Sequence, residues 1–463
     1  MLDSRRRGGD PNARPGSVAP SRSISHRTLQ RIEDRLGGNF HLVRGSFGIM
    51  ASTTLTSLAG FLFYVIAAHR WPAGQVGVAT SLVAALSTIA LIAGQPIATT
   101  ILLRIPRAAH RRHLLHAGLL SAMAISSVEA VIAIVVLPSS VHEVRTVGLG
   151  ALFCVGAIAT SAGIVLDASS LAIRRPQLMV IRNASFGAGK LLLLAVIAIP
   201  AGLVSGPVAV VGTWAALSVA SCAWERHKWL AAERVATEAD PVIDERGARR
   251  AGWAALRAGF GLQVIGVLGG SLPPQLLPIL VVGILGTVYA GCFSITWLVG
   301  GLCFMISPAV CQALLAEGSL HPDELAKKVR AAAVLSSAIL AVPLFVYVFA
   351  GNLVLGLFGH TYAVHGTTLL VILAVSAIPD LITNVAIARY RVQNRLGAAA
   401  FVNGLIAVIA VGGAAWALPR YGINGAGWAW TVAEVAGCVA LLAVAAASGR
   451  PSRAYGDTVG ARS

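Results

Sequence analysis

From residue 45 almost to its end, the chain alternates apolar stretches with short polar segments. The stretches are about 20 residues long, the length of a helix that crosses the hydrocarbon core of a bilayer. Each must be helical, because a span exposed to lipid has to satisfy its backbone hydrogen bonds internally. The pattern predicts twelve spans, at 46–68, 77–103, 114–137, 146–172, 178–199, 206–224, 254–280, 286–314, 329–350, 364–387, 396–418 and 424–447.

Composition supports this interpretation. Of the 463 residues, 56% are hydrophobic and only 12% are charged, whereas soluble domains carry about 25% charged residues. A chain of this length would have too little polar surface to be a water-soluble globule. We therefore predict an all-α polytopic membrane protein. The net charge of +17 does not indicate nucleic-acid binding, because the basic residues are not gathered on a soluble module.

The basic residues instead indicate orientation. With the N-terminus inside, 31 of the 36 Lys and Arg residues fall in the tails and in alternate loops, a set that includes Arg182 at the start of the fifth span. Such asymmetry predicts that both termini are cytoplasmic. Residues 1–44 are then a disordered basic cytoplasmic tail, 225–250 a cytoplasmic linker and 448–463 a C-terminal cytoplasmic tail.

The cysteines predict no special chemistry. All six lie within apolar runs and none forms a CxxC pair, which is typical of cysteines buried as small hydrophobic residues. We expect neither a disulfide framework nor a zinc site, and the sequence indicates no other metal or cofactor.

The two halves of the chain repeat each other. Arg44-Gly-Ser-Phe-Gly48 corresponds to Arg257-Ala-Gly-Phe-Gly261, 213 residues later, and Asp167 corresponds to Asp380 at the same offset. Six spans per half is an even number, so both halves have the same orientation in the membrane. The repeat predicts two pseudo-symmetric six-helix bundles, at 45–224 and 251–447. Two parallel bundles around a central site are typical of a transporter that works by alternating access.

Two segments carry a resemblance to a known family. Residues 61–106 and 389–426, the second containing the turn Pro419-Arg-Tyr-Gly-Ile-Asn-Gly-Ala426, resemble bacterial polysaccharide-biosynthesis flippases of the multidrug/oligosaccharidyl-lipid/polysaccharide (MOP) exporter superfamily. The resemblance implies a MATE/MOP-like fold of about 12 transmembrane helices, with two bundles around a central cavity. It also implies transfer of a polyprenyl-pyrophosphate-linked oligosaccharide from the inner to the outer leaflet of the bacterial cell membrane. The implied partners are this lipid-linked oligosaccharide, membrane lipids and other polysaccharide-assembly proteins.

Three basic residues are candidates for the substrate cavity. Lys190 lies near the middle of the fifth span, where an isolated cation is costly and usually functional. We expect it to face the cavity and bind phosphate; the alternative is a structural ion pair, for example with Asp167. Arg44 and Arg257 open the first helix of each half, where they either line the cytoplasmic mouth of the cavity or extend to lipid phosphate.

Four acidic residues and a proline pair complete the candidate set. We expect Asp167 and Asp380 to tie helix ends to neighbouring arginines, with ion coupling as the alternative. Glu129 and Glu434 are either protonatable coupling carboxylates or residues that face polar partners. Pro273 and Pro274 are expected to bend the seventh span, either as part of a gate or as a passive kink.

Two other function classes compete with the flippase. A membrane glycosyltransferase would need acidic catalytic groups on the outer face, but the predicted outer loops hold only Glu143; we therefore expect no enzyme. A multidrug or other small-molecule exporter, MATE-like or major-facilitator-like, remains the alternative. The major-facilitator version would normally have a Gly-x-x-x-Asp-Arg-x-Gly-Arg-like turn after the second span, where this chain has Arg104–Arg112. The sequence leaves the sugar, the coupling ion and the oligomeric state open.

Overall fold

The computed structural model describes residues 58–107, 111–199, 203–237, 253, 272–307, 311, 325–393 and 396–448. Within these ranges all regular structure is helical. Ten of the described helices are long and apolar enough to cross a membrane. Two shorter apolar helices, Leu58–Arg70 and Pro273–Leu285, overlap the last residues of the first and seventh predicted spans, whose earlier residues lie outside the described ranges. The prediction of an all-α polytopic membrane protein is confirmed.

Each predicted span that lies in the described residues coincides with a helix. The helices of the first half are α3 (Ala73–Arg104), α4 (Arg111–Val136), α5 (Val147–Ala172), α6 (Pro176–Ala198) and α7 (Gly206–Thr237). Those of the second half are α9 (Pro273–Leu285), α10 (Thr287–Phe304), α12 (Leu325–Gly356), α13 (His360–Val392), α14 (Leu396–Tyr421) and α15 (Ile423–Ser448). Short 3₁₀ turns, η2 (Ile105–Arg107) and η3 (Ser139–Arg145), follow α3 and α4.

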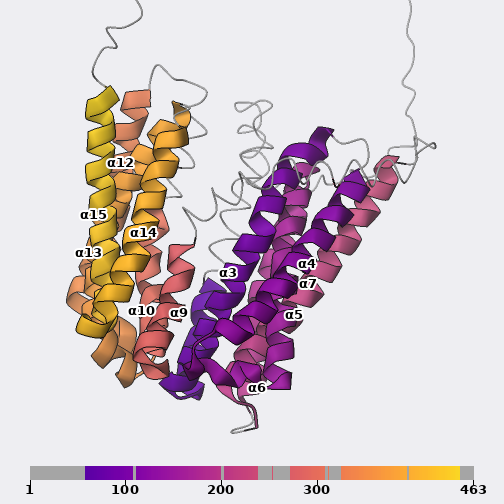
Figure 1. The fold of residues 1–463 in the computed structure, drawn as a ribbon, viewed down its shortest axis with the longest axis horizontal. Helices are drawn as coiled ribbons and strands as arrows, with labels where there is room; N and C mark the ends of the chain where they lie inside the picture. Colours follow the sequence, from indigo (N-terminus) through magenta and orange to yellow (C-terminus); the bar gives the residue numbers. More distant parts are fainter. Residues whose placement is uncertain are drawn as a thin grey trace, which may run out of the picture. The chain divides into compact units, whose positions relative to one another are not determined.

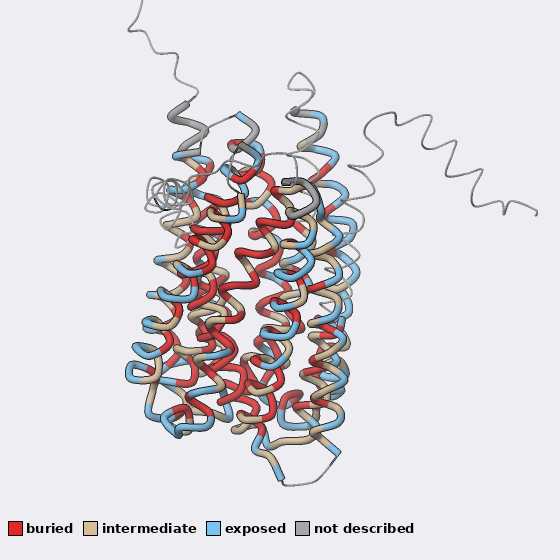
Figure 2. Tube along the Cα trace, turned by 90° about the vertical axis from the view of Figure 1, so that its right-hand side faces the viewer, coloured by how far each residue is buried: buried red, intermediate tan, exposed pale blue. Residues whose placement is uncertain are grey.

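The helices pack mainly within their own half of the sequence (Figure 1). In the first half, α5 lies between α3, α4 and α7, and α6 packs on α7 and α5. In the second half, α13 packs on α10, α12 and α15, and α14 pairs with α15. Buried residues follow the inner faces of the helices (Figure 2). Large apolar side chains such as Val136, Phe349 and Leu353 are about three-quarters exposed, as expected for surfaces that face lipid, which is as apolar as leucine.

Glycines bring α3 and α10 into backbone contact. A Cβ atom on Gly77 would overlap the carbonyl oxygen of Thr287, and one on Gly291 would overlap that of Ala73. Small residues that let two backbones approach are typical of helix packing in membranes. This crossing joins the first half of the sequence to the second.

Two local features bear on the predictions. Pro273 and Pro274 occupy the first turn of α9, where the missing N–H would be unpaired anyway. Residues 254–271 of the predicted seventh span lie outside the described residues, so the expected bend of that span stays a prediction. Helix α7 continues to Thr237 and therefore runs through the first part of the segment expected to be a linker.

Candidate functional site

A buried ion network joins three helices of the first half. Arg182, in the second turn of α6, donates from Nε to Asp167 Oδ1 of α5 at 2.9 Å and from Nη2 to Asp167 Oδ2. Its Nε also lies 3.1 Å from Glu225 Oε2 of α7, and Ser170 Oγ donates to Glu225 Oε1 at 2.7 Å. The guanidinium thus forms a bidentate ion pair with Asp167, which is a strong geometry for an arginine and a carboxylate. It forms a second ion pair, through Nε, with Glu225.

The network has two negative charges for one positive charge. Arg182 is 8% exposed and Glu225 is fully buried, so these charges have left water and depend on each other. Gly163 of α5 makes the space: a Cβ there would lie 2.7 Å from Arg182 Nη1. These are the two ion pairs formed among the residues that the structure describes.

One member of the network remains accessible. A cavity of about 280 Å³ between α3 and α5 reaches Asp167, and Gln95 and Thr99 of α3 line it with polar groups. Asp167 retains 20% exposure of its side chain. A polar molecule or ion that enters from α3 would therefore meet Asp167 before the buried Arg182.

Lys190 lies in an aromatic box. Its Nζ is 5.4 Å from the ring centroid of Phe63, 5.0 Å from Phe186 and 4.6 Å from Trp214. These rings come from the helix Leu58–Arg70, from α6 and from α7, so three elements enclose one ammonium group, which is 5% exposed. Aromatic faces attract a cation within about 6 Å of their centroid, and here they offset part of the cost of burial.

The box is held in place independently of the lysine. Trp214 Nε1 donates to Thr160 Oγ1 of α5 at 3.2 Å. Phe186 meets the indole edge to face, with ring centroids 5.2 Å apart. Among the described residues no carboxylate pairs with Lys190. The alternative of a Lys190–Asp167 ion pair is therefore wrong, because Asp167 pairs with Arg182 instead.

The second half holds two buried carboxylates. Asp380 of α13 is 6% exposed, and its Oδ2 accepts a hydrogen bond from Ser307 Oγ at 2.8 Å. Glu434 of α15 is 4% exposed and accepts from Thr383 Oγ1 at 2.8 Å. Neither carboxylate forms an ion pair with a described residue. Among the described residues, both carboxylates therefore accept hydrogen bonds from hydroxyl groups and neither is paired with a cation.

The repeat-related aspartates share a position but differ in partner. Asp167 and Asp380 each lie 20 residues after the first residue of their helix. Asp167 has an arginine partner, as expected for both residues. For Asp380 this expectation is wrong in the described part of the chain, because its partner is Ser307, from the segment after α10.

The remaining candidates are separate from these sites. Glu129 of α4 is half-buried, and its Oε2 has no hydrogen-bond partner among the described residues. Arg44 and Arg257 lie outside the described residues. Sequence reasoning missed both Arg182 and Glu225, because it counted Arg182 at the start of the fifth span among the cytoplasmic charges and placed Glu225 in the linker. Both lie on helices that are long and apolar enough to cross a membrane. The available signal for Arg182 was Pro176, because a proline commonly opens a helix, and a helix that starts there has Arg182 in its second turn.

No protein-family model matches the sequence, and no curated protein matches it. Solved structures do match. An inward-facing multidrug resistance MATE family transporter of the MOP superfamily is 13% identical with a TM-score of 0.65, over 86% of this chain and 96% of that chain. The lipid II flippase MurJ, in an inward closed conformation, is 10% identical with a TM-score of 0.63, over 86% of this chain and 87% of that chain.

A MOP superfamily transporter from Pyrococcus furiosus is 14% identical, with a TM-score of 0.55 over 89% of this chain and 96% of that chain. It is described as having a binding pocket of reverse polarity that suggests a different function. At such low identities the likeness concerns the fold. This chain is therefore a multi-pass membrane protein with the fold shared by MATE transporters of the MOP superfamily and by the lipid II flippase MurJ.

Proposed function

We propose that this protein is a flippase that moves a polyprenyl-pyrophosphate-linked oligosaccharide from the inner to the outer leaflet by alternating access. The two halves, 45–224 and 251–447, would act as the two moving bundles. The lipid II flippase MurJ, which shares the fold, is a protein named for a lipid-linked substrate. We place this chain in a bacterial cell membrane with both termini cytoplasmic, as a transporter that performs no catalysis.

The observation that carries the proposal is the buried charge of Lys190. Its ammonium group has aromatic neighbours and, among the described residues, no carboxylate partner. A cation without a counter-charge inside a membrane span is costly and usually functional. A pyrophosphate group would supply the missing negative charge, whereas a cationic drug would be repelled. The local electrostatics thus favour an anionic substrate.

A polyprenyl-pyrophosphate-linked oligosaccharide needs a protein to move its polar head group across the membrane. A pyrophosphate-sugar head group cannot cross hydrocarbon unaided, because stripped polar and ionised groups cost several to tens of kcal/mol. The polyprenyl tail can stay in lipid while the head group passes through the protein. Other polysaccharide-assembly proteins would supply this substrate on one side and consume it on the other.

Export of cationic small molecules is the second candidate. Asp380 and Glu434 are buried carboxylates with no cationic partner among the described residues, and a multidrug MATE transporter shares the fold. In that case a drug cation would bind in the second half of the chain, and Lys190 would serve only to repel it from the first.

Lipid analysis of a deletion strain separates the two candidates. If the protein is a flippase, cells without it accumulate a lipid-linked oligosaccharide on the inner leaflet, which mass spectrometry of extracted lipids detects. Expression of the wild-type chain should restore the normal pool. Unchanged lipid pools together with altered drug tolerance would reject the flippase and favour the exporter.

A further inference from the structure

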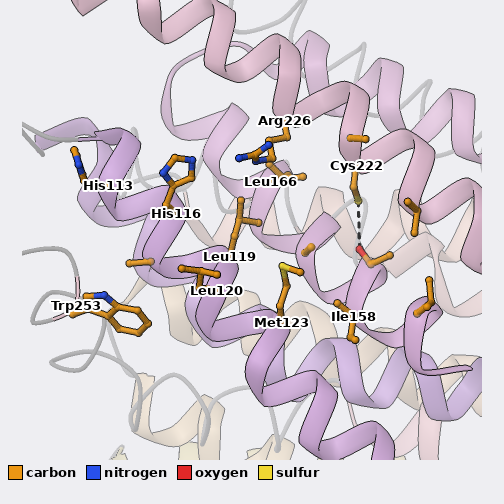
Figure 3. Close-up of a pocket in the computed structure, with 16 residues that line it drawn as sticks. His113, His116, Leu119, Leu120, Met123, Ile158, Leu166, Cys222, Arg226 and Trp253 are labelled. Carbon is orange, nitrogen blue, oxygen red and sulfur yellow. Dashed lines mark hydrogen bonds between the residues drawn. The ribbon is translucent and has the colours of Figure 1, made fainter. Parts of the chain in front are cut away.

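A second site lies in the first half, away from Lys190. A cavity of about 810 Å³ opens between α4, α5 and α7, with Trp253 at its rim (Figure 3). Ligand pockets commonly span about 300–1,000 Å³, so this one is large enough for a sizeable molecule. Neither Lys190 nor the rings around it belong to its lining.

One end of this groove is basic. His113 and His116 of α4 and Arg226 of α7 lie close together in Figure 3. Arg226 supplies a positive charge and the histidines supply ring nitrogens that can donate hydrogen bonds, and none of the described residues that line the groove is a carboxylate. His116 Nε2 is buried and has no hydrogen-bond partner among the described residues. Buried polar atoms nearly always have a partner, and an anionic group at this end of the groove would provide one.

The rest of the groove is apolar and open to the side. Its wall includes Leu120, Met123, Val155 and Val219, which are 41–58% exposed. Met123 lies seven residues beyond His116 on α4, a distance of roughly 10 Å along the helix axis. The basic end lies near the start of the candidate α4 span at Arg111, and the ends of a membrane span lie next to the polar head-group region. We therefore expect the basic end of the groove to face lipid head groups and its apolar end to face hydrocarbon.

We propose that this groove binds an anionic glycerophospholipid of the surrounding membrane. The lipid phosphate would contact Arg226 and His116, and one acyl chain would lie along Leu120 and Met123. Basic pockets between transmembrane helices are known to hold acidic lipid head groups. Such a lipid would bridge α4 and α7, and would bind independently of the transported molecule.

The test measures thermal unfolding of the purified full-length chain in nanodiscs of pure phosphatidylcholine or of phosphatidylcholine doped with phosphatidylglycerol. A ligand that binds only the folded state raises the unfolding midpoint, so phosphatidylglycerol should raise it by several degrees. Arg226→Gln should abolish this shift. Lys228→Gln should retain it, because Lys228 is exposed on the same helix but does not line the groove.

A second pair of variants tests the hydrocarbon end. Met123→Trp fills the groove and should also abolish the shift, whereas Val128→Trp, at an exposed α4 position outside the groove, should not. If Arg226→Gln does not fold, His116→Gln takes its place, with the exposed His227→Gln as control. The proposal is overturned if the unfolding midpoint is the same with and without phosphatidylglycerol, or if inorganic phosphate raises it by the same amount. It is also overturned if the groove variants show the same shift as their control variants.

Discussion

The positive charge of Lys190 is the feature on which recognition of an anionic head group would depend. Replacing it by methionine keeps the volume in the aromatic box and removes the charge. A hydrogen bond to a charged group is worth about 1.5–3 kcal/mol, so we expect Lys190→Met to slow transport at least tenfold. Lys190→Arg should retain a larger share of activity. Both are measured as flipping of a labelled pyrophosphate lipid in proteoliposomes.

The control for this experiment is Lys228→Met, which removes an exposed charge from α7 and should leave transport unchanged. Equal thermal stability of Lys190→Met and the wild type would show that the loss concerns recognition. Transport by Lys190→Met at the wild-type rate would reject a role for Lys190 in binding phosphate.

Arg182 is predicted to matter for stability. Its loss leaves the carboxylates of Asp167 and Glu225 facing each other across a buried space. Breaking a buried ion pair by removing one partner costs about 3–5 kcal/mol, so Arg182→Gln should lower the midpoint of thermal unfolding strongly. Arg175→Gln, at the exposed start of α6, is the control and should have little effect.

Neutralising the carboxylates tests the cause. Adding Asp167→Asn and Glu225→Gln to Arg182→Gln removes the uncompensated charges, and we expect most of the lost stability to return. A triple variant no more stable than Arg182→Gln would show instead that the guanidinium stabilises the protein by packing.

At the scale of elements, the close crossing of α3 and α10 at their glycines predicts that a larger side chain there will destabilise the protein. Gly291→Val places a side chain where the carbonyl oxygen of Ala73 lies, so the two helices must separate. Overpacking typically costs about 1–3 kcal/mol, and the variant should unfold at lower temperature and lose transport. Gly301→Val on the same helix has no neighbour within 4 Å of its Cβ and should behave like the wild type; equal behaviour of the two variants would contradict the close crossing.

The helices could be predicted because hydropathy and span length report them directly. Helix α5 at Val147–Ala172 and α14 at Leu396–Tyr421 differ from the predicted spans by only a few residues. The partners of charged residues could not be predicted, because they depend on contacts between separate helices. Lys190 and Asp167 were both recognised as buried candidates, but only the packing of α5, α6 and α7 assigns Asp167 to Arg182 and Lys190 to aromatic rings.

For the whole molecule, the distribution of Lys and Arg predicts its orientation in the membrane. Arg145 of η3 and Lys228 of α7 are both exposed and should lie on opposite sides. With the native cysteines replaced, a membrane-impermeant maleimide added to intact cells should label Arg145→Cys and not Lys228→Cys. Inverted membrane vesicles should give the reverse result. Labelling in the same preparation for both variants would reject the predicted topology.

The proposed cargo also predicts how the whole protein responds to membrane potential. Each negative charge that moves outward across an inside-negative potential of 100 mV gains about 2.3 kcal/mol, which is a shift of roughly fiftyfold in the equilibrium between leaflets. Proteoliposomes with a potassium gradient and valinomycin can impose this potential with either sign. The labelled pyrophosphate lipid should accumulate in the leaflet on the positive side, and its distribution should reverse when the sign is reversed. Lys190→Met should approach the same distribution at least tenfold more slowly. If the ratio of labelled lipid between the two leaflets does not change with the potential, the head group crosses with its charge neutralised. That result would point to a co-transported cation at the buried carboxylates Asp380 and Glu434.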